Sequence, residues 1–195
     1  MEIGRARHRK CRRKKGVAVV GKDFSKNYYT GMKGVYFRAI QKAIVGIAGL
    51  DRRTVKILDF GCGSGELKKL LGAKVVGFDV LPELSDVSDW KAVDFDVVVA
   101  NEIFYLFSEK ELEKTLLEFK AKNPGTELVV GIARQNLLGG ILAVLAGEPD
   151  AHSNTLMQPK KELEMLQKHF RLKARKNVFG LCDVFYFKPL RGDGG

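Results

Sequence analysis

Residues 57–65 read Ile-Leu-Asp-Phe-Gly-Cys-Gly-Ser-Gly, and this stretch decides the fold. Its mainly apolar beginning, extended backward to residue 55, predicts a buried strand. The alternating glycines predict a tight turn in which backbone can approach a ligand without an intervening side chain. A short helix over residues 66–71 is expected next, ending at Gly72. A strand, a glycine-rich turn and a helix in this order indicate the start of a nucleotide-binding α/β unit.

Outward from this stretch, strand and helix patterns alternate along the chain. Strands are expected at 55–60, 75–79, 95–100 and 127–133, and helices at 26–50, 66–71, 108–122, 135–146 and 160–170. Two last strands, 172–178 and 182–188, have the spacing of a hairpin. The alternation predicts a Rossmann-like, mostly parallel seven-stranded sheet with helices on both faces and an antiparallel C-terminal hairpin. Its third strand must be very short, because residues 81–91 are polar and irregular.

The charge of the chain is concentrated at its N-terminal end. Residues 1–50 contain 13 Lys and Arg against 2 Asp and Glu, whereas residues 51–195 contain 21 of each sign. We therefore expect a flexible basic tail over residues 1–22 and one domain over residues 23–190. The tail either is a solvated arm or contacts RNA or an anionic membrane surface through residues 1–15.

The composition also excludes several classes of protein. Cys11, Cys62 and Cys182 are far apart without a CxxC spacing, and the three histidines do not cluster, so neither a disulfide framework nor a metal site is expected. No apolar run reaches the ~18 residues that span a bilayer. The sequence therefore predicts a cytoplasmic protein without a transmembrane segment.

An acidic residue follows the second predicted strand. Asp79 stands twenty residues after Asp59, and a carboxylate at this position can accept hydrogen bonds from both hydroxyls of a ribose. The glycine turn and Asp79 together allow a dinucleotide or S-adenosylmethionine (SAM). The structural alternative is a tight turn that binds no ligand.

Residues 57–65 resemble the first motif of class I SAM-dependent methyltransferases, in which an acidic residue, one apolar residue and G-x-G-x-G follow one another. The dinucleotide fingerprint G-x-G-x-x-G would require a glycine where Glu66 stands. The resemblance implies SAM as cofactor, with Asp59 near the methionine amino end of SAM. It places the turn residues against the cofactor, and these are Gly61, Cys62, Gly63 and Gly65.

The resemblance continues after the glycine turn. Residues 75–79 are similar to the second motif of the family, which implies Asp79 on the ribose diol and Val80 against the adenine. Asp89, with Trp90 beside it, falls where the family places an acid for the adenine amino group. Asp86 is a rival for that role, and a solvated acidic loop is the structural alternative.

Residues 95–102 resemble the fourth motif of the family. The match implies Asn101 and Glu102 beside the methyl donor, whereas capping of the strand end is the structural alternative. His152 lies in a polar loop that the family often places near the substrate; otherwise it is a solvated loop residue. Glu102 and His152 are the candidates for a catalytic base.

The sequence thus predicts a SAM-dependent methyltransferase. Residues 101–104 lack the Asn/Asp-Pro-Pro-aromatic motif of enzymes that methylate the exocyclic amines of bases, which argues against that class of substrate. The chain resembles the ubiquinone/menaquinone-type group, which favours a small-molecule or lipid-like acceptor. Residues 137–146 are apolar on nearly all faces, so they either line an acceptor pocket or form a core helix. Two alternatives are an RNA or protein methyltransferase recruited through the basic N-terminus and a non-catalytic SAM-fold binding protein.

Overall fold

The computed structural model describes residues 31–134 and 155–190. The basic tail, the segment 137–146 and His152 lie outside the described residues. None of the helices within the described ranges is long and apolar enough to cross a membrane.

The described strands form one sheet with the order β2-β1-β3-β4-β6-β5. The strands are β1 (Ile57–Phe60), β2 (Val75–Phe78), β3 (Val97–Asn101), β4 (Glu127–Ala133), β5 (Phe170–Val178) and β6 (Cys182–Pro189). The first four are parallel, and β6 pairs antiparallel with both β4 and β5. The expected C-terminal hairpin is therefore confirmed, and it closes one edge of the sheet.

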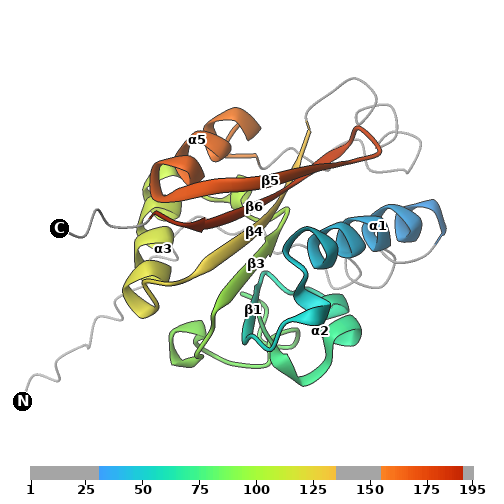
Figure 1. Ribbon diagram of the computed structural model, residues 1–195, viewed down its shortest axis with the longest axis horizontal. Helices are drawn as coiled ribbons and strands as arrows, with labels where there is room; N and C mark the ends of the chain where they lie inside the picture. Colours follow the sequence, from blue (N-terminus) through green and yellow to red (C-terminus); the bar gives the residue numbers. More distant parts are fainter. Residues whose placement is uncertain (1–30, 135–154, 191–195) are drawn as a thin grey trace, which may run out of the picture.

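Helices cover both faces of the sheet (Figure 1). The face with α1 (Gly31–Ala48) and α2 (Glu66–Leu71) buries one apolar cluster, and the face with α3 (Glu109–Lys122) and α5 (Pro159–His169) buries another. The second cluster is rich in aromatic rings, including the fully buried Phe104 and Phe119. Burial of each such ring contributes about 1.5–3 kcal/mol.

Local signals set the ends of the helices as the sequence predicted. Ser108 and Glu111 form a reciprocal capping box at the start of α3. Pro159 opens α5, where its missing N–H has no helical partner to lose. α1 begins at Gly31 within the described range and turns the apolar side chains of Ile40 and Ile44 onto the sheet.

The predicted third strand is wrong, because the described sheet has six strands and residues 79–96 contain only turns and a short 3-10 helix, η3 (Trp90–Ala92). This segment folds back on the edge of β2 through side chains. Asp86 Oδ2 accepts from the Gly77 N–H at 2.7 Å, and Ser85 Oγ accepts from the Asp79 N–H at 3.0 Å. These bonds occupy edge donors that a further strand would have used.

The four parallel strands end at one edge of the sheet. Their carboxyl ends lead into the glycine turn, Asp79, Glu102 and Arg134. Ligands of open α/β sheets bind at this edge. The motif residues that directly follow β1, β2 and β3 therefore share this edge, whereas Asp89 and Trp90 lie in the segment between β2 and β3.

Candidate functional site

The glycine turn after β1 is held against the end of β2. The N–H groups of Gly61 and Cys62 both donate to the carbonyl oxygen of Phe78, at 2.8 and 3.1 Å. Gly61 has φ 81°, and a Cβ there would lie 2.9 Å from Cγ1 of Ile103. Only glycine fits both the backbone conformation and the space.

Asp79 links the end of β2 to this turn. Its Oδ2 accepts from the Gly63 N–H and its Oδ1 from the Leu81 N–H, both at 3.0 Å. A carboxylate offers about four lone-pair sites, so two such bonds leave acceptor capacity for a ligand. The neighbouring Val80 is 79% exposed, which leaves an apolar surface beside a carboxylate that is positioned by backbone donors.

Asp59 is a buried acid beneath the turn. The residue is 5% exposed, although it stands in a strand that is otherwise apolar. Burial, and then the charges of Asp79 and Asp86, raise the pKa of Asp59 to about 7. A carboxyl group in this position favours a positively charged neighbour, because a cation would offset the cost of its ionisation.

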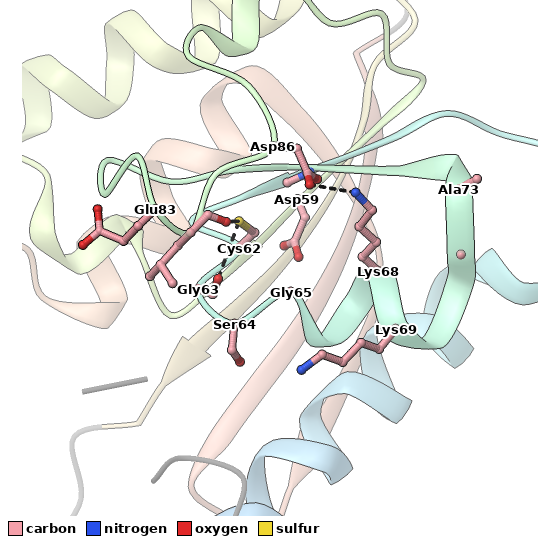
Figure 2. Close-up of a pocket in the computed structure, with 13 residues that line it drawn as sticks. Asp59, Cys62, Gly63, Ser64, Gly65, Lys68, Lys69, Ala73, Glu83 and Asp86 are labelled. Carbon is pink, nitrogen blue, oxygen red and sulfur yellow. Dashed lines mark hydrogen bonds and ion pairs between the residues drawn. The ribbon is translucent and has the colours of Figure 1, made fainter. Parts of the chain in front are cut away.

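A cavity of about 610 Å³ runs along the flank of the turn. Figure 2 shows Asp59, the turn residues, Lys68 of α2 and Asp86 around it. Of the predicted site residues, the cavity is lined by Asp59, Cys62, Gly63 and Gly65, together with the rival acid Asp86. The volume is in the range of small-ligand sites. The other predicted residues lie outside its lining.

The two rival acids for adenine have different surroundings. Asp86 forms an ion pair with Lys68 at 2.7 Å and accepts a hydrogen bond from the Gly77 N–H. Both contacts lower the pKa of Asp86. Asp89 is exposed and accepts from the Lys91 N–H at 3.0 Å, which caps η3. Asp86 thus holds the β2 edge, while the adenine role of Asp89 stays a prediction.

Trp90 is a core residue. It is 7% exposed, and its ring lies 4.8 Å from that of Phe119, centroid to centroid. Packing of this kind accounts for the tryptophan without a ligand. Its predicted contact with the cofactor stays a prediction.

The residues after β3 form the second half of the site. Glu102 has φ 51°, a left-handed conformation that is uncommon for any residue other than glycine. Its N–H donates to the Gly131 carbonyl at 2.9 Å, and the Tyr36 hydroxyl donates to its Oε1 at 2.9 Å. Burial raises the pKa of Glu102, while hydrogen bonds from Tyr36 and Cys182 oppose this. Backbone strain at a strand end is a frequent property of functional residues.

Asn101, the last residue of β3, has a buried Oδ1 without a hydrogen-bond partner among the described residues. Its side chain lies directly over Gly131 of β4, where a Cβ would be only 2.2 Å from this oxygen. A glycine in the neighbouring strand therefore creates the space that the amide occupies. A buried acceptor without a donor is costly, and a ligand N–H or O–H would satisfy it.

Sequence reasoning missed one acid. Glu162, in the first turn of α5, is 2% exposed, and burial together with the charge of Glu102 raises its pKa to about 8. A glutamate near a helix N-terminus usually lies at the surface, where its negative charge interacts favourably with the helix dipole. Its burial could have been predicted from spacing, because Glu162 shares one face of α5 with the buried Met165, Leu166 and His169.

Known proteins that resemble this chain indicate the class of fold to which it belongs. No protein-family model matches the chain. Over 120 residues, 60% of its length, the chain is 31% identical to MJ1252, an uncharacterised protein of Methanocaldococcus jannaschii. It spans 45% of the length of that relative, so the two proteins share a part rather than a whole.

Solved structures share the fold more completely. PH0226 of Pyrococcus horikoshii has a TM-score of 0.65 at 15% identity, over 85% of this chain and 95% of that one. The N-methyltransferase NodS of Bradyrhizobium japonicum, in complex with S-adenosyl-L-homocysteine (SAH), has 0.57 at 16%, over 79% and 87%. Magnesium protoporphyrin IX methyltransferase of Synechocystis, with bound SAH, has 0.56 at 13%, over 84% and 91%.

At these identities the likeness is one of fold. The chain has the α/β fold of class I SAM-dependent methyltransferases, which the motif at residues 57–65 predicted.

Proposed function

We propose that this chain binds SAM at the glycine turn and transfers its methyl group to a small-molecule acceptor. The observation that carries the proposal is the buried Asp59 beneath a turn that only glycine can form. SAM carries two positive groups, the methionine ammonium and the sulfonium. A carboxyl group whose pKa is raised to about 7 by burial and nearby acids would be stabilised as its anion by such a ligand.

Several described residues fit the other parts of the cofactor. Asp79 retains acceptor capacity for ribose hydroxyls, and the exposed Val80 offers an apolar contact for the adenine. Gly63 and Gly65, both with positive φ, line the cavity, and a Cβ at either position would have no atom within 4 Å, so the turn presents backbone there without a side chain. Asn101, at the end of β3, has an Oδ1 without a partner among the described residues, and a polar group of the cofactor or acceptor could donate to it.

The bound cofactor supplies a methyl group that is already activated by the positive sulfur. The protein then has to hold the acceptor in line with the methyl group and to keep water away. Glu102 is the candidate to take a proton from the acceptor, because burial raises its pKa and with it the proton affinity of the carboxylate. The predicted role of His152 stays a prediction, as do the lipid-like acceptor and the RNA or membrane contacts of the tail.

Calorimetry tests the proposal. SAM and SAH should bind the full chain with 1:1 stoichiometry, whereas NAD should not bind. The matched variants are Asp59→Asn, beneath the turn, and Asp94→Asn, whose side chain is 73% exposed at the opposite end of the strands. The first should weaken SAM binding and the second should leave it unchanged. Binding of NAD in place of SAM would overturn the proposal.

A further inference from the structure

Two acids from distant parts of the chain lie close enough for the charge of Glu102 to raise the pKa of Glu162. Glu102 follows β3, and Glu162 lies in the first turn of α5. The segment before α5 is tied to the turn η4 (Phe104–Leu106), because the N–H groups of Leu156 and Met157 both donate to the Tyr105 carbonyl, at 2.8 and 3.2 Å. This connection brings the start of α5 over the residues that follow Glu102.

The acidic pair adjoins the glycine turn. Ile103, the residue after Glu102, fills the space in front of Gly61, so closely that a Cβ on Gly61 would be 2.9 Å from it. β3 is also the direct neighbour of β1, the strand that leads into the turn. Glu102 therefore stands next to the place where the cofactor methyl group is proposed to lie.

Burial leaves one oxygen of Glu162 without a partner. Its Oε1 is fully buried and has no hydrogen-bond partner among the described residues. Within the described ranges, no lysine, arginine or histidine forms an ion pair with Glu162 or with Glu102. The pKa of Glu162 is raised by burial first and by the charge of Glu102 second. A buried, unpaired acid is costly to a protein and is a frequent sign of a ligand site.

Among the described residues, none of the titratable groups that influence the pKa values of the pair is positively charged. Burial and the charge of Glu102 raise the pKa of Tyr36, of Tyr105 and of the Cys182 thiol, so all three stay neutral at physiological pH. Glu162 also contributes to the shift of Tyr105. The surroundings are therefore two acids, two phenols and a thiol. A positively charged ligand would stabilise the ionised form of both acids, and its hydrogen bonds to them would be ionic on both sides, whereas a neutral donor offers no charge of its own.

We propose that the methyl acceptor is an amine, which enters as an ammonium ion and binds between Glu102 and Glu162. This inference rests on the proposed methyltransferase function. An ammonium group has up to three N–H donors, which would satisfy the unpartnered Oε1 of Glu162 and the free acceptor sites of Glu102. It would also remove the repulsion between the two acids.

The reaction balances with these residues. The ammonium gives one proton to a carboxylate, and the nitrogen lone pair that this frees attacks the methyl carbon of SAM. The new N–C bond forms as the S–C bond breaks, and the bonding electron pair of that bond stays on sulfur, which leaves neutral SAH. The product is a methylated ammonium ion, which can release a further proton to the second carboxylate or to water.

Calorimetry on the full chain saturated with SAH tests the acceptor class with two matched pairs of probes. Benzylamine is compared with benzyl alcohol, and butylamine with butanol, because each pair differs mainly in charge. We expect at least one amine to bind about tenfold more tightly than its alcohol, which corresponds to about 1.4 kcal/mol. Glu162→Gln should remove most of this preference without changing alcohol binding. Glu164→Gln, at an exposed position of the same helix, should preserve the preference.

The outcomes separate the two proposals. If SAH does not bind, the methyltransferase function fails, and the amine inference fails with it. If SAH binds but the alcohols bind as tightly as the amines, or neither class binds, only the amine inference is overturned. An amine preference that survives Glu162→Gln also overturns it. A folded Glu162→Gln variant is verified by unchanged SAH affinity.

Discussion

Asp79 at the glycine turn and Glu162 in α5 are two acids that the molecule holds in opposite ways. At the glycine turn, Asp79 is half-buried, and backbone N–H groups satisfy one lone pair on each of its oxygens. Glu162, by contrast, is buried with an oxygen that has no partner among the described residues, and Glu102 has a strained backbone. Asp79 is therefore positioned by the backbone before any ligand binds, whereas Glu162, like the buried Asp59 beneath the turn, is costly to ionise until a positive group binds.

The largest expected effect comes from a substitution in the glycine turn. Gly61→Ala introduces a Cβ that would lie 2.9 Å from Ile103 at φ 81°, and we expect a loss of about 2–4 kcal/mol in the free energy of unfolding. The control is Gly180→Ala, which has φ 73° but no atom within 4 Å of the new Cβ, so it should cost about 1–2 kcal/mol. Urea denaturation measures both. Equal losses would mean that the contact with Ile103 is unimportant.

The next effect concerns the buried acid under the turn. The pKa of Asp59 is raised from 3.8 to about 7 in the folded protein, so the folded state binds the extra proton between these values. The contribution of Asp59 to stability is therefore present below pH 4 and is lost as the pH rises toward 7 and beyond. We expect a fall of roughly 2–4 kcal/mol, relative to Asp59→Asn, between pH 4.5 and pH 8. Parallel stability profiles of wild type and variant would contradict the raised pKa.

A smaller effect is expected from the loss of the hydrogen bond between Tyr36 and Glu102. Tyr36→Phe removes the hydroxyl that donates to Glu102, and we expect a loss of about 1.5 kcal/mol in the free energy of unfolding. Tyr186→Phe is the matched control, because its acceptor Glu127 also holds Arg53 at 2.7 Å and should be less affected. Denaturation at pH 7.5 compares the two variants. A larger loss for Tyr186→Phe would show that Glu102 does not depend on Tyr36.

Local patterns predicted most of the fold. The alternation of elements, the hairpin, the capping box at Ser108 and the helix start at Pro159 are confirmed, because each depends on residues that are close in sequence. The third strand is wrong, because the composition of residues 81–91 did not reveal that Ser85 and Asp86 would bond back to β2. Such side-chain bonds compete with a strand and have no periodic signature.

The surroundings of Glu102 were only partly predictable. Glu102 was selected through a motif, but Tyr36, Cys182 and Glu162 come from α1, β6 and α5 and meet only through the tertiary fold. Glu162 in particular has the sequence features of an exposed helix-start residue. Its burial depends on the packing of α5 against η4, which no short-range pattern encodes.

The central claim, that the glycine turn and Asp79 bind SAM, is tested most directly by the affinity for SAH of the full chain and of two variants. Asp79→Ala removes the proposed ribose contact, and we predict about a tenfold loss of affinity, about 1.4 kcal/mol. Asp94→Ala, with its exposed side chain, should bind like wild type. An unchanged affinity of Asp79→Ala, or no binding of SAH by the wild-type chain, would contradict the account.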